Sequence, residues 1–455
     1  MLQDLTATQR DSITYLCDEY KKYNYINNDD WAKYGVKRGL RNANGTGVLA
    51  GLTSICDVVG YDMEDGERVP IDGKLYYRGI DVADIVEAGK KEDRYIYEEI
   101  VWLLLFGSLP TQAQMDMFRA LIAELRDLPT GFAEDMIMKA PSPNVMNKMA
   151  RSVLALYSYD DDAEDQSFEH TMCQAIQLIA CMPTIMVNAY QVKRRVFDKK
   201  SMYIHQTKPE LSMAQNILRT NRSNKKFTEE EARLLDLCLV LHADHGGGNN
   251  SAFATRVLTS SGTDTFAAIS AALGSLKGPR HGGANIKVME MLNCIKEGVR
   301  DYHDDDEIAA FLRRILNREA GDGAGLIYGI GHPVYTKTDP RATILRQNAK
   351  ELAENTGMGD DFCLLNAVER LAPNLVEQVR GVKNSCANVD LYSGLVFKSM
   401  KMPVDLYTPL FAVSRTAGWC AHLMEERLFG NRIIRPAYKY LGVMREYVPI
   451  GERKE

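Results

Sequence analysis

Residues 228–246 read TEEEARLLDLCLVLHADHG, and this stretch indicates the fold class. Its first four residues form a capping box, in which a threonine and the glutamate three positions later satisfy backbone groups at a helix start. Leu234, Leu237 and Leu241 follow at helical spacing. The stretch therefore predicts an apolar helix that stops near Gly246, where glycines follow a pair of histidines.

Similar helix signals recur along the chain, whereas strand signals are few. Asp264 is expected to cap a helix over residues 265–276, and Asn285 is expected to cap the helix that follows. Only residues 49–59 and 73–77, on either side of a turn-rich segment, look like strands. We therefore expect an all-α fold with a small N-terminal β-hairpin or sheet.

Composition excludes several classes of protein. The net charge of −6 argues against a general nucleic-acid binder, which needs a basic surface. The nine cysteines are irregularly spaced and form no C-x-x-C pair, so we expect reduced thiols. The N-terminus lacks a leader pattern, and the most apolar stretch, residues 175–190, is too short and polar for a membrane span. We therefore expect a cytoplasmic protein without a membrane partner.

Dinucleotide and metal motifs are weak. Residues 45–50 read GTGVLA, which fits G-x-G-x-x-A, but they follow Asn-Ala-Asn rather than an apolar strand. His242 and His245 lie three apart without the H-E-x-x-H pattern, and no cysteine is near. We therefore expect no metal and no cofactor.

A set of histidines, arginines and one aspartate could carry chemistry. Two histidines sit among glycines, which allow the backbone to approach a ligand, and one arginine lies inside an apolar helix. Buried structural histidines, internal ion pairs and a helix-capping aspartate are the plain alternatives. Together the residues suit acid–base chemistry on a small polyanion. The set is His281, His332, Arg341, Arg415, Arg435 and Asp390.

In their order along the chain, these segments resemble citrate synthase. The resemblance extends from about Gly47 to Gly442, and the ordered set of motifs is far more specific than any single motif. The matching segments are 75–81 (LYYRGID), 102–110 (WLLLFGSLP), 242–245 (HADH), 278–285 (GPRHGGAN), 331–341 (GHPVYTKTDPR), 388–394 (NVDLYSG), 415–422 (RTAGWCAH) and 435–436 (RP).

The resemblance implies a two-domain helical protein that acts in the tricarboxylic acid cycle. Residues 1–282 and 401–455 would form the large domain, and residues 283–400 the small domain that closes over the substrates. It also implies a homodimer with a shared active site, whose substrates are acetyl-CoA and oxaloacetate.

Residue roles follow from the same resemblance. Asp390 would remove a proton from the acetyl-CoA methyl group, His281 would bind the thioester oxygen, and His332 would polarise the oxaloacetate carbonyl. Four residues would hold oxaloacetate, the last from the other subunit, and two would contact CoA. The oxaloacetate set is His245, Arg341, Arg415 and Arg435, and the CoA pair is Lys383 and Asn388.

Two departures leave the acyl substrate open. Gly246 stands where mitochondrial-type enzymes have glutamate, and residues 331–336, GHPVYT, look more like the 2-methylcitrate branch, which uses propionyl-CoA. The alternatives are therefore a 2-methylcitrate synthase or an enzyme of dual specificity. Two other classes are a non-catalytic CoA-thioester-binding regulator, which would not need Asp390 as a base, and a helical scaffold, which ligands would not stabilise.

Overall fold

The computed structural model describes residues 5–453 and divides the chain into two compact units. One unit joins Met1–Leu49 to Arg435–Glu455, and the other is Ala50–Ile434. The terminal unit contains α1 (Ala7–Tyr23), which begins with a capping box at Thr6, and α2 (Asn28–Lys33). The expected small domain, residues 283–400, lies within the second unit and stays a prediction.

The larger unit is mostly helical, as expected. Its first helical group contains α3 (Val82–Lys91), α4 (Tyr97–Phe106), α5 (Gln112–Glu124), α6 (Val145–Leu156), α7 (Phe168–Val196), α8 (Met213–Asn221), α9 (Glu229–His242), α10 (Asn250–Thr259) and α11 (Thr265–Leu276). The later helices are α12 (Ala284–Gly298), α13 (Asp305–Leu316), α14 (Pro340–Asn355), α15 (Gly359–Arg380), α16 (Asp390–Ser399) and α17 (Tyr407–Phe429).

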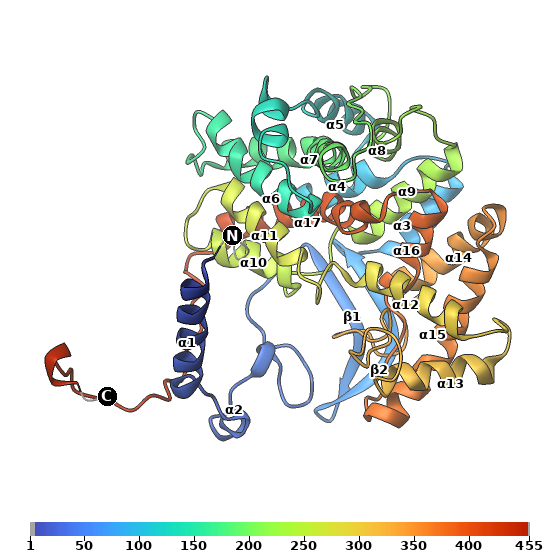
Figure 1. Ribbon diagram of the computed structural model, residues 1–455. Helices are drawn as coiled ribbons and strands as arrows, with labels where there is room; N and C mark the ends of the chain where they lie inside the picture. Colours follow the sequence, from blue (N-terminus) through green and yellow to red (C-terminus); the bar gives the residue numbers. More distant parts are fainter. Residues whose placement is uncertain (1–4, 454–455) are drawn as a thin grey trace. The chain divides into compact units, whose positions relative to one another are not determined.

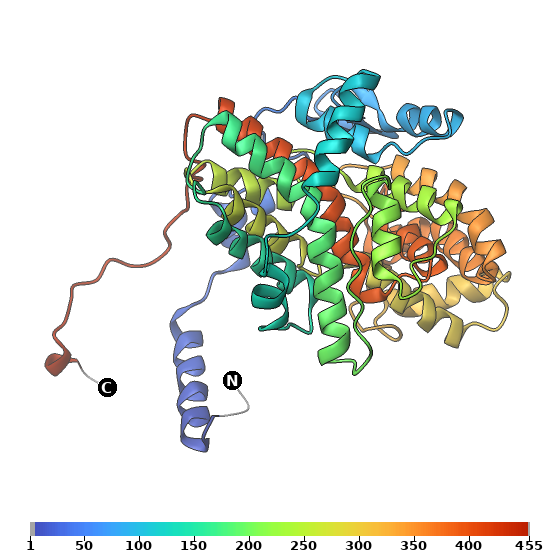
Figure 2. The same cartoon turned by 90° about the horizontal axis from the view of Figure 1, so that it is seen from above.

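Helix α17 organises the first group. It is apolar along most of its length, with residues 407–424 all buried, and it packs against α4, α7, α9, α10 and α11 (Figure 1). The view from above shows α17 running alongside the long helix α7 (Figure 2). The polar side chains of α17 are therefore held inside the core and must find partners there.

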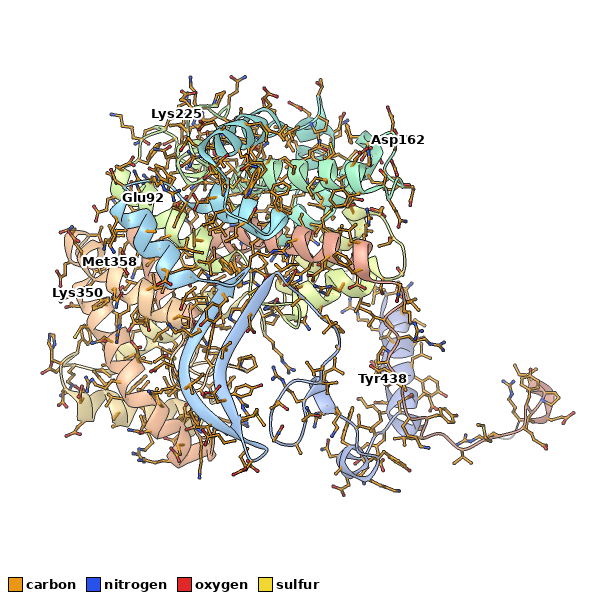
Figure 3. The ribbon with its side chains drawn as sticks, turned by 180° about the vertical axis from the view of Figure 1, so that it is seen from behind. Glu92, Asp162, Lys225, Lys350, Met358 and Tyr438 are labelled. Carbon is orange, nitrogen blue, oxygen red and sulfur yellow. The ribbon has the colours of Figure 1, made fainter. Side chains whose placement is uncertain are left out.

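Helices α12 to α16 form a second group, in which α16 packs against α12, α14 and α15. In Figure 3 the labelled Lys350 and Met358 mark the α14–α15 side of this group, whereas Asp162 lies on the opposite side of the unit. The N-terminus of α16 therefore brings Asp390 into the buried region between helices.

A three-stranded antiparallel sheet, in the order β1–β2–β3, accompanies the helices. Its strands are β1 (Cys56–Glu64), β2 (Glu67–Tyr77) and β3 (Ile80–Asp81). The sheet confirms the expected N-terminal hairpin, but its bounds differ from the expected ones. Strand β1 begins at Cys56 rather than at residue 49 and continues past residue 59, and β2 begins at Glu67 rather than at residue 73. The β1–β2 register shifts between Val59 and Tyr61, and this irregularity faces a loop of the candidate site.

Helix α7 is longer than the sequence suggested. It has 29 residues and is long and apolar enough to cross a membrane, so the expectation that this segment is too short for a span was wrong. Of its most apolar window, 78% is buried inside the protein, as in the core helix of a globular protein. No other described helix passes the same test.

Candidate functional site

The loop after α9 is held by α17 and carries His245. Arg415 Nε donates to the carbonyl of His242 at 2.6 Å, and the backbone N–H of Gly418 donates to the carbonyl of Ala243 at 3.2 Å. A Cβ on Gly418 would lie 2.5 Å from that same carbonyl, so only glycine permits this approach without a shift. The helix thereby fixes the backbone from which His245 projects.

The buried rings of His245 and Tyr335 meet the half-buried ring of His332. The His245 ring centroid lies 5.0 Å from that of His332 and 5.5 Å from that of Tyr335, and the last two rings stack at 4.6 Å. Burial and the nearby cations Arg341 and Arg415 hold the pKa of His245 well below its ordinary value. His245 is therefore neutral at physiological pH.

The tautomer of His332 follows from its backbone contacts. Its Nδ1 accepts hydrogen bonds from the N–H groups of Val334 at 3.1 Å and Tyr335 at 3.0 Å. An acceptor nitrogen carries no proton in neutral imidazole, so the hydrogen lies on Nε2. His332 can therefore donate from Nε2 to an electron-rich oxygen.

The sheet holds the loop that carries His332. Thr336 Oγ1 donates to the carbonyl of Gly60, and Thr338 Oγ1 accepts from the N–H of Gly73 at 3.0 Å. A Cβ on Gly60 would come within 2.6 Å of the Val334 carbonyl. Glycine in the irregular part of β1 thus lets the loop lie directly on the strands.

Two buried arginines supply positive charge to this cluster. Arg341 forms a bidentate pair with Asp339, Nε to Oδ1 at 3.0 Å and Nη2 to Oδ2 at 2.8 Å. Arg415 is 0% exposed, and among residues 5–453 neither of its terminal nitrogens has a hydrogen-bond partner. Since buried N–H donors without partners are costly, the terminal nitrogens of Arg415 are arranged to receive an anion.

Asp390 is a buried carboxyl group at the start of α16. Burial raises its pKa to about 7, although Arg341 and Arg415 partly oppose this shift. Its Oδ1 has no hydrogen-bond partner within the described part of the chain. A carboxyl group with a pKa near neutrality and a free oxygen suits proton removal.

Asn388 links the Asp390 and His332 segments. Its Oδ1 accepts from the N–H of Asp390 at 3.0 Å, and its Nδ2 donates to the carbonyl of Gly331 at 2.9 Å. The Asn388 N–H also donates to the Gly329 carbonyl at 2.8 Å. Asn388 therefore ties the backbone of Asp390, the candidate base, to the loop that carries His332.

His281 lies between α11 and α12 and bonds to a serine that the sequence did not single out. Its Nε2 is 3.0 Å from Ser251 Oγ, which also accepts from Trp419 Nε1 at 3.0 Å. Burial, with a smaller effect of Arg415, lowers the pKa of His281 to about 4. His281 is therefore a neutral hydrogen-bonding group rather than a cation.

The structure brings six of the nine predicted residues into one neighbourhood, connected by ring contacts or electrostatic interactions. These are His245, His281, His332, Arg341, Asp390 and Arg415. Asn388 adjoins them, Lys383 is exposed in the preceding loop, and Arg435 is exposed and belongs to the terminal unit. The residue roles stay predictions.

The sequence analysis missed two residues of this site. Tyr335 was within a quoted motif, but nothing marked it as a buried ring stacked on His332. Ser251 gave no signal, because its bond to His281 joins positions 30 residues apart. A separate cavity of about 260 Å³ between α3, α9 and α14 contains none of the predicted residues.

Comparisons with known proteins agree on one family. The family model described as "Citrate synthase, C-terminal domain" matches residues 42–437. The citrate synthase of Synechocystis sp. is 34% identical over 390 residues, covering 84% of this chain and 89% of the relative. That of Haloferax volcanii is 34% identical and covers 92% of this chain and 99% of the relative. The 2-methylcitrate synthase 1 of Corynebacterium glutamicum is 30% identical over 420 residues, covering 92% and 98%.

Solved structures give the same picture. The Thermoplasma acidophilum citrate synthase, in a ternary complex with carboxymethyl coenzyme A and oxaloacetate, aligns with a TM-score of 0.75 and 27% identity. The alignment covers 92% of this chain and 99% of that structure. The citrate synthase of Thermotoga maritima aligns with a TM-score of 0.71 and 29% identity, covering 92% and 100%.

Proposed function

This chain belongs to the citrate synthase family and is an acyl-transferring enzyme that makes citrate, and from that premise we propose how its residues act on acetyl-CoA and oxaloacetate. The carbon–carbon bond forms between the acetyl methyl carbon and the keto carbon of oxaloacetate. Water then hydrolyses the resulting thioester to citrate and CoA.

The main evidence for an oxaloacetate site is the guanidinium of Arg415. A fully buried cation with two unpartnered terminal nitrogens, in the described part of the chain, matches a carboxylate that accepts both N–H groups. Arg341 supplies a second buried cation, although Asp339 already binds two of its nitrogens. Two such groups suit a dicarboxylate better than a monocarboxylate.

His332 activates oxaloacetate in this scheme. Its Nε2–H donates to the keto oxygen, because Nδ1 is occupied as an acceptor by two backbone N–H groups. Charge develops on this oxygen as the carbon nucleophile attacks, and a donor fixed beforehand stabilises it. His245, whose ring is 5.0 Å from His332, orients the same substrate.

Asp390 and His281 activate acetyl-CoA. Asp390 takes a proton from the methyl group, and the electron pair moves into the carbonyl to give an enol-like species. Ser251 Oγ lies 2.9 Å from Asn249 Oδ1 and 3.0 Å from His281 Nε2, and it has one hydrogen to donate. When that hydrogen goes to His281 Nε2, the hydrogen of the neutral ring lies on Nδ1 and can bind the thioester oxygen. The low pKa of His281 keeps this donor neutral.

The scheme includes several features of assembly. Residues 283–400 close over the substrates, since the guanidinium of Arg415 is buried and a substrate must enter before closure. Two copies of the chain form a homodimer, in which Arg435 completes the partner's site, and Lys383 and Asn388 lie along the CoA path. The chemistry is acid–base catalysis with no cofactor, in the cytoplasm.

Acyl preference is the direct test. We expect acetyl-CoA to be preferred and propionyl-CoA to be used as well, because a pocket discriminates one methylene by only about 1–3 kcal/mol, roughly 10- to 200-fold in kcat/KM. Release of CoA thiol is measured with oxaloacetate and each thioester in turn. Without release from either thioester, the chain would be a binding protein on this fold.

A 2-methylcitrate synthase is the second candidate, favoured by residues 331–336 and by the Corynebacterium relative. A higher kcat/KM for propionyl-CoA would establish it in place of citrate formation. The catalytic assignments would be unchanged, since both reactions require the same base and the same electrophile.

A further inference from the structure

Asp244 is a buried carboxylate beside the oxaloacetate site that the proposed mechanism does not use. It is 0% exposed, and its Oδ2 accepts from the Gly246 N–H at 3.2 Å and from His422 Nε2 at 3.0 Å. Gly418 faces the other oxygen, since a Cβ there would lie 2.5 Å from Asp244 Oδ1. Ionising a carboxyl group buried this completely is costly unless a nearby group stabilises its charge.

Asp244 is the last of three successive residues, 242 to 244, that helix α17 contacts. Arg415, Gly418 and His422 lie on successive turns of one face of α17. They bind successive residues of the loop: Arg415 and Gly418 bind the backbone of 242 and 243, and His422 binds the side chain of Asp244. The oxaloacetate arginine and the Asp244 contact therefore share one rigid element.

The proton position on His422 follows from its second partner. Arg256 Nη2 donates to His422 Nδ1 at 2.8 Å, and Arg256 is itself held by Glu425 and by Glu426 at 3.0 Å. Because a guanidinium can only donate hydrogen bonds, Nδ1 of His422 must be the acceptor and Nε2 must carry the ring hydrogen. His422 is therefore a neutral ring that donates to Asp244 and leaves the charge of Asp244 uncompensated.

Arg415 balances the negative charge of Asp244. Burial lowers the pKa of Arg415, and the largest opposing effect is the charge of Asp244. Burial also acts to raise the pKa of Asp244, but the hydrogen bonds from His422 and Gly246 and the charge of Arg415 outweigh it and hold that pKa below its ordinary value. Asp244 therefore neutralises Arg415 without a direct hydrogen bond, since among the described residues Asp244 Oδ1 and both terminal nitrogens of Arg415 have no hydrogen-bond partner.

We propose that His422 is a positioning residue for oxaloacetate, which holds Asp244 as a remote counter-ion of Arg415. The guanidinium then stays charged in the core while both terminal nitrogens stay open to the substrate carboxylate. Arg256 acts one step further away by fixing the tautomer of His422. The inference deepens the proposed function and depends on its assignment of Arg415.

The test compares four proteins: wild type, His422→Leu, His422→Gln and Ser414→Ala. Leucine removes both hydrogen bonds, whereas glutamine offers a donor and an acceptor and can replace the imidazole. Ser414 is the matched control, because it is buried on the same helix and donates to the Leu239 carbonyl on α9, away from the loop. Calorimetry without CoA gives the Kd of oxaloacetate, and kinetics give KM and kcat.

We expect His422→Leu to raise the Kd and KM of oxaloacetate about tenfold, the effect of losing one buried hydrogen bond to a charged group. Its kcat at saturating oxaloacetate should fall less than about threefold, since binding and not chemistry is impaired. His422→Gln should restore affinity to within about threefold of wild type, and Ser414→Ala should match wild type.

Wild-type affinity in His422→Leu would overturn the inference, as would equal losses in the leucine and glutamine variants, which would indicate a packing role. If His422→Leu does not fold, Asp244→Asn decides the question: a similar rise in Kd supports the inference and an unchanged Kd overturns it. A wild-type protein that binds oxaloacetate without making citrate would refute the proposed function alone, because the Kd comparison is independent of turnover.

Discussion

Asp390 combines burial at the start of α16 with a carboxyl group whose pKa is raised to about 7. We expect Asp390→Ala to lower kcat by at least about 10² with little change in oxaloacetate binding, because the base acts on the other substrate. Steady-state kinetics and calorimetry measure the two effects. Retention of half the wild-type turnover would remove Asp390 from the mechanism.

Ionisation of the buried Asp390 carboxyl group should lower the free energy of unfolding. Its folded pKa of about 7 exceeds its ordinary value of 3.8, so between these values the folded state binds more protons and the free energy of unfolding falls as pH rises. Asparagine does not ionise. Asp390→Asn should therefore stabilise the protein relative to wild type at pH 8, by at least about 1 kcal/mol more than at pH 5.

Asp361 provides the matched control. It is also buried, but Lys296 and Lys398 bind it at 2.5 and 2.6 Å and lower its pKa. Asp361→Asn should destabilise the protein almost equally at pH 5 and pH 8, since both lie above its pKa in either state. Denaturant unfolding at the two pH values would contradict this account if both asparagine variants showed the same pH trend.

At the scale of single residues, the sequence predicted those site residues whose signal lies within one short segment of the chain. The glycines around His281 and His332 and the unusual arginine of an apolar helix were visible in one stretch of chain each. The pairing of Ser251 with His281, and the double contact of Asn388, depend on segments brought together by packing. No spacing rule encodes such contacts.

At the scale of elements, Gly418 lets α17 approach the loop before His245. A Cβ there would lie 2.5 Å from both the Ala243 carbonyl and Asp244 Oδ1, and the Asp244 carboxylate is held through its Oδ2 by Gly246 and His422. We expect Gly418→Ala to destabilise the protein by roughly 1–3 kcal/mol and to weaken oxaloacetate binding, because the helix must move away. Unfolding curves and calorimetry measure both effects.

Gly274 on α11 is the control for that substitution. A Cβ there would meet no described atom within 4 Å, so Gly274→Ala gains helix propensity without a clash. It should be neutral or stabilising by up to about 1 kcal/mol. Equal destabilisation by the two alanines would show that the loop contact is not the reason for Gly418.

Elements with local start and stop signals were predicted well. The capping box at Thr228 and the cap at Asp264 are confirmed, and α11 has the expected bounds. The Asn285 prediction was wrong: α12 begins at Ala284 after Gly283, and Asn285 is buried inside it. The strand bounds were also wrong: residues 49–55 are not part of β1, and the strands reach further toward the turn than expected, because the polar ends of β1 and β2 gain their order from pairing rather than from an apolar pattern.

At the scale of the whole molecule, the terminal unit holds the one predicted oxaloacetate ligand that is exposed, Arg435. An exposed arginine of a separate unit can serve a site only if the chain or a partner brings it there. The homodimer proposal assigns Arg435 to the partner's site. The same proposal places Arg415 in the site of its own subunit.

Mixed dimers distinguish these arrangements. Arg435→Ala and Arg415→Ala homodimers should each lose at least about 10² in kcat/KM, since each removes a charged contact from every site. If Arg435 acts across the dimer, a heterodimer of the two variants has one site that receives both intact arginines and one that receives neither. It should therefore recover up to about half of wild-type activity, measured after co-expression with two affinity tags. If Arg435 acts within its own subunit, every site lacks one arginine and purified heterodimers stay as inactive as their parents.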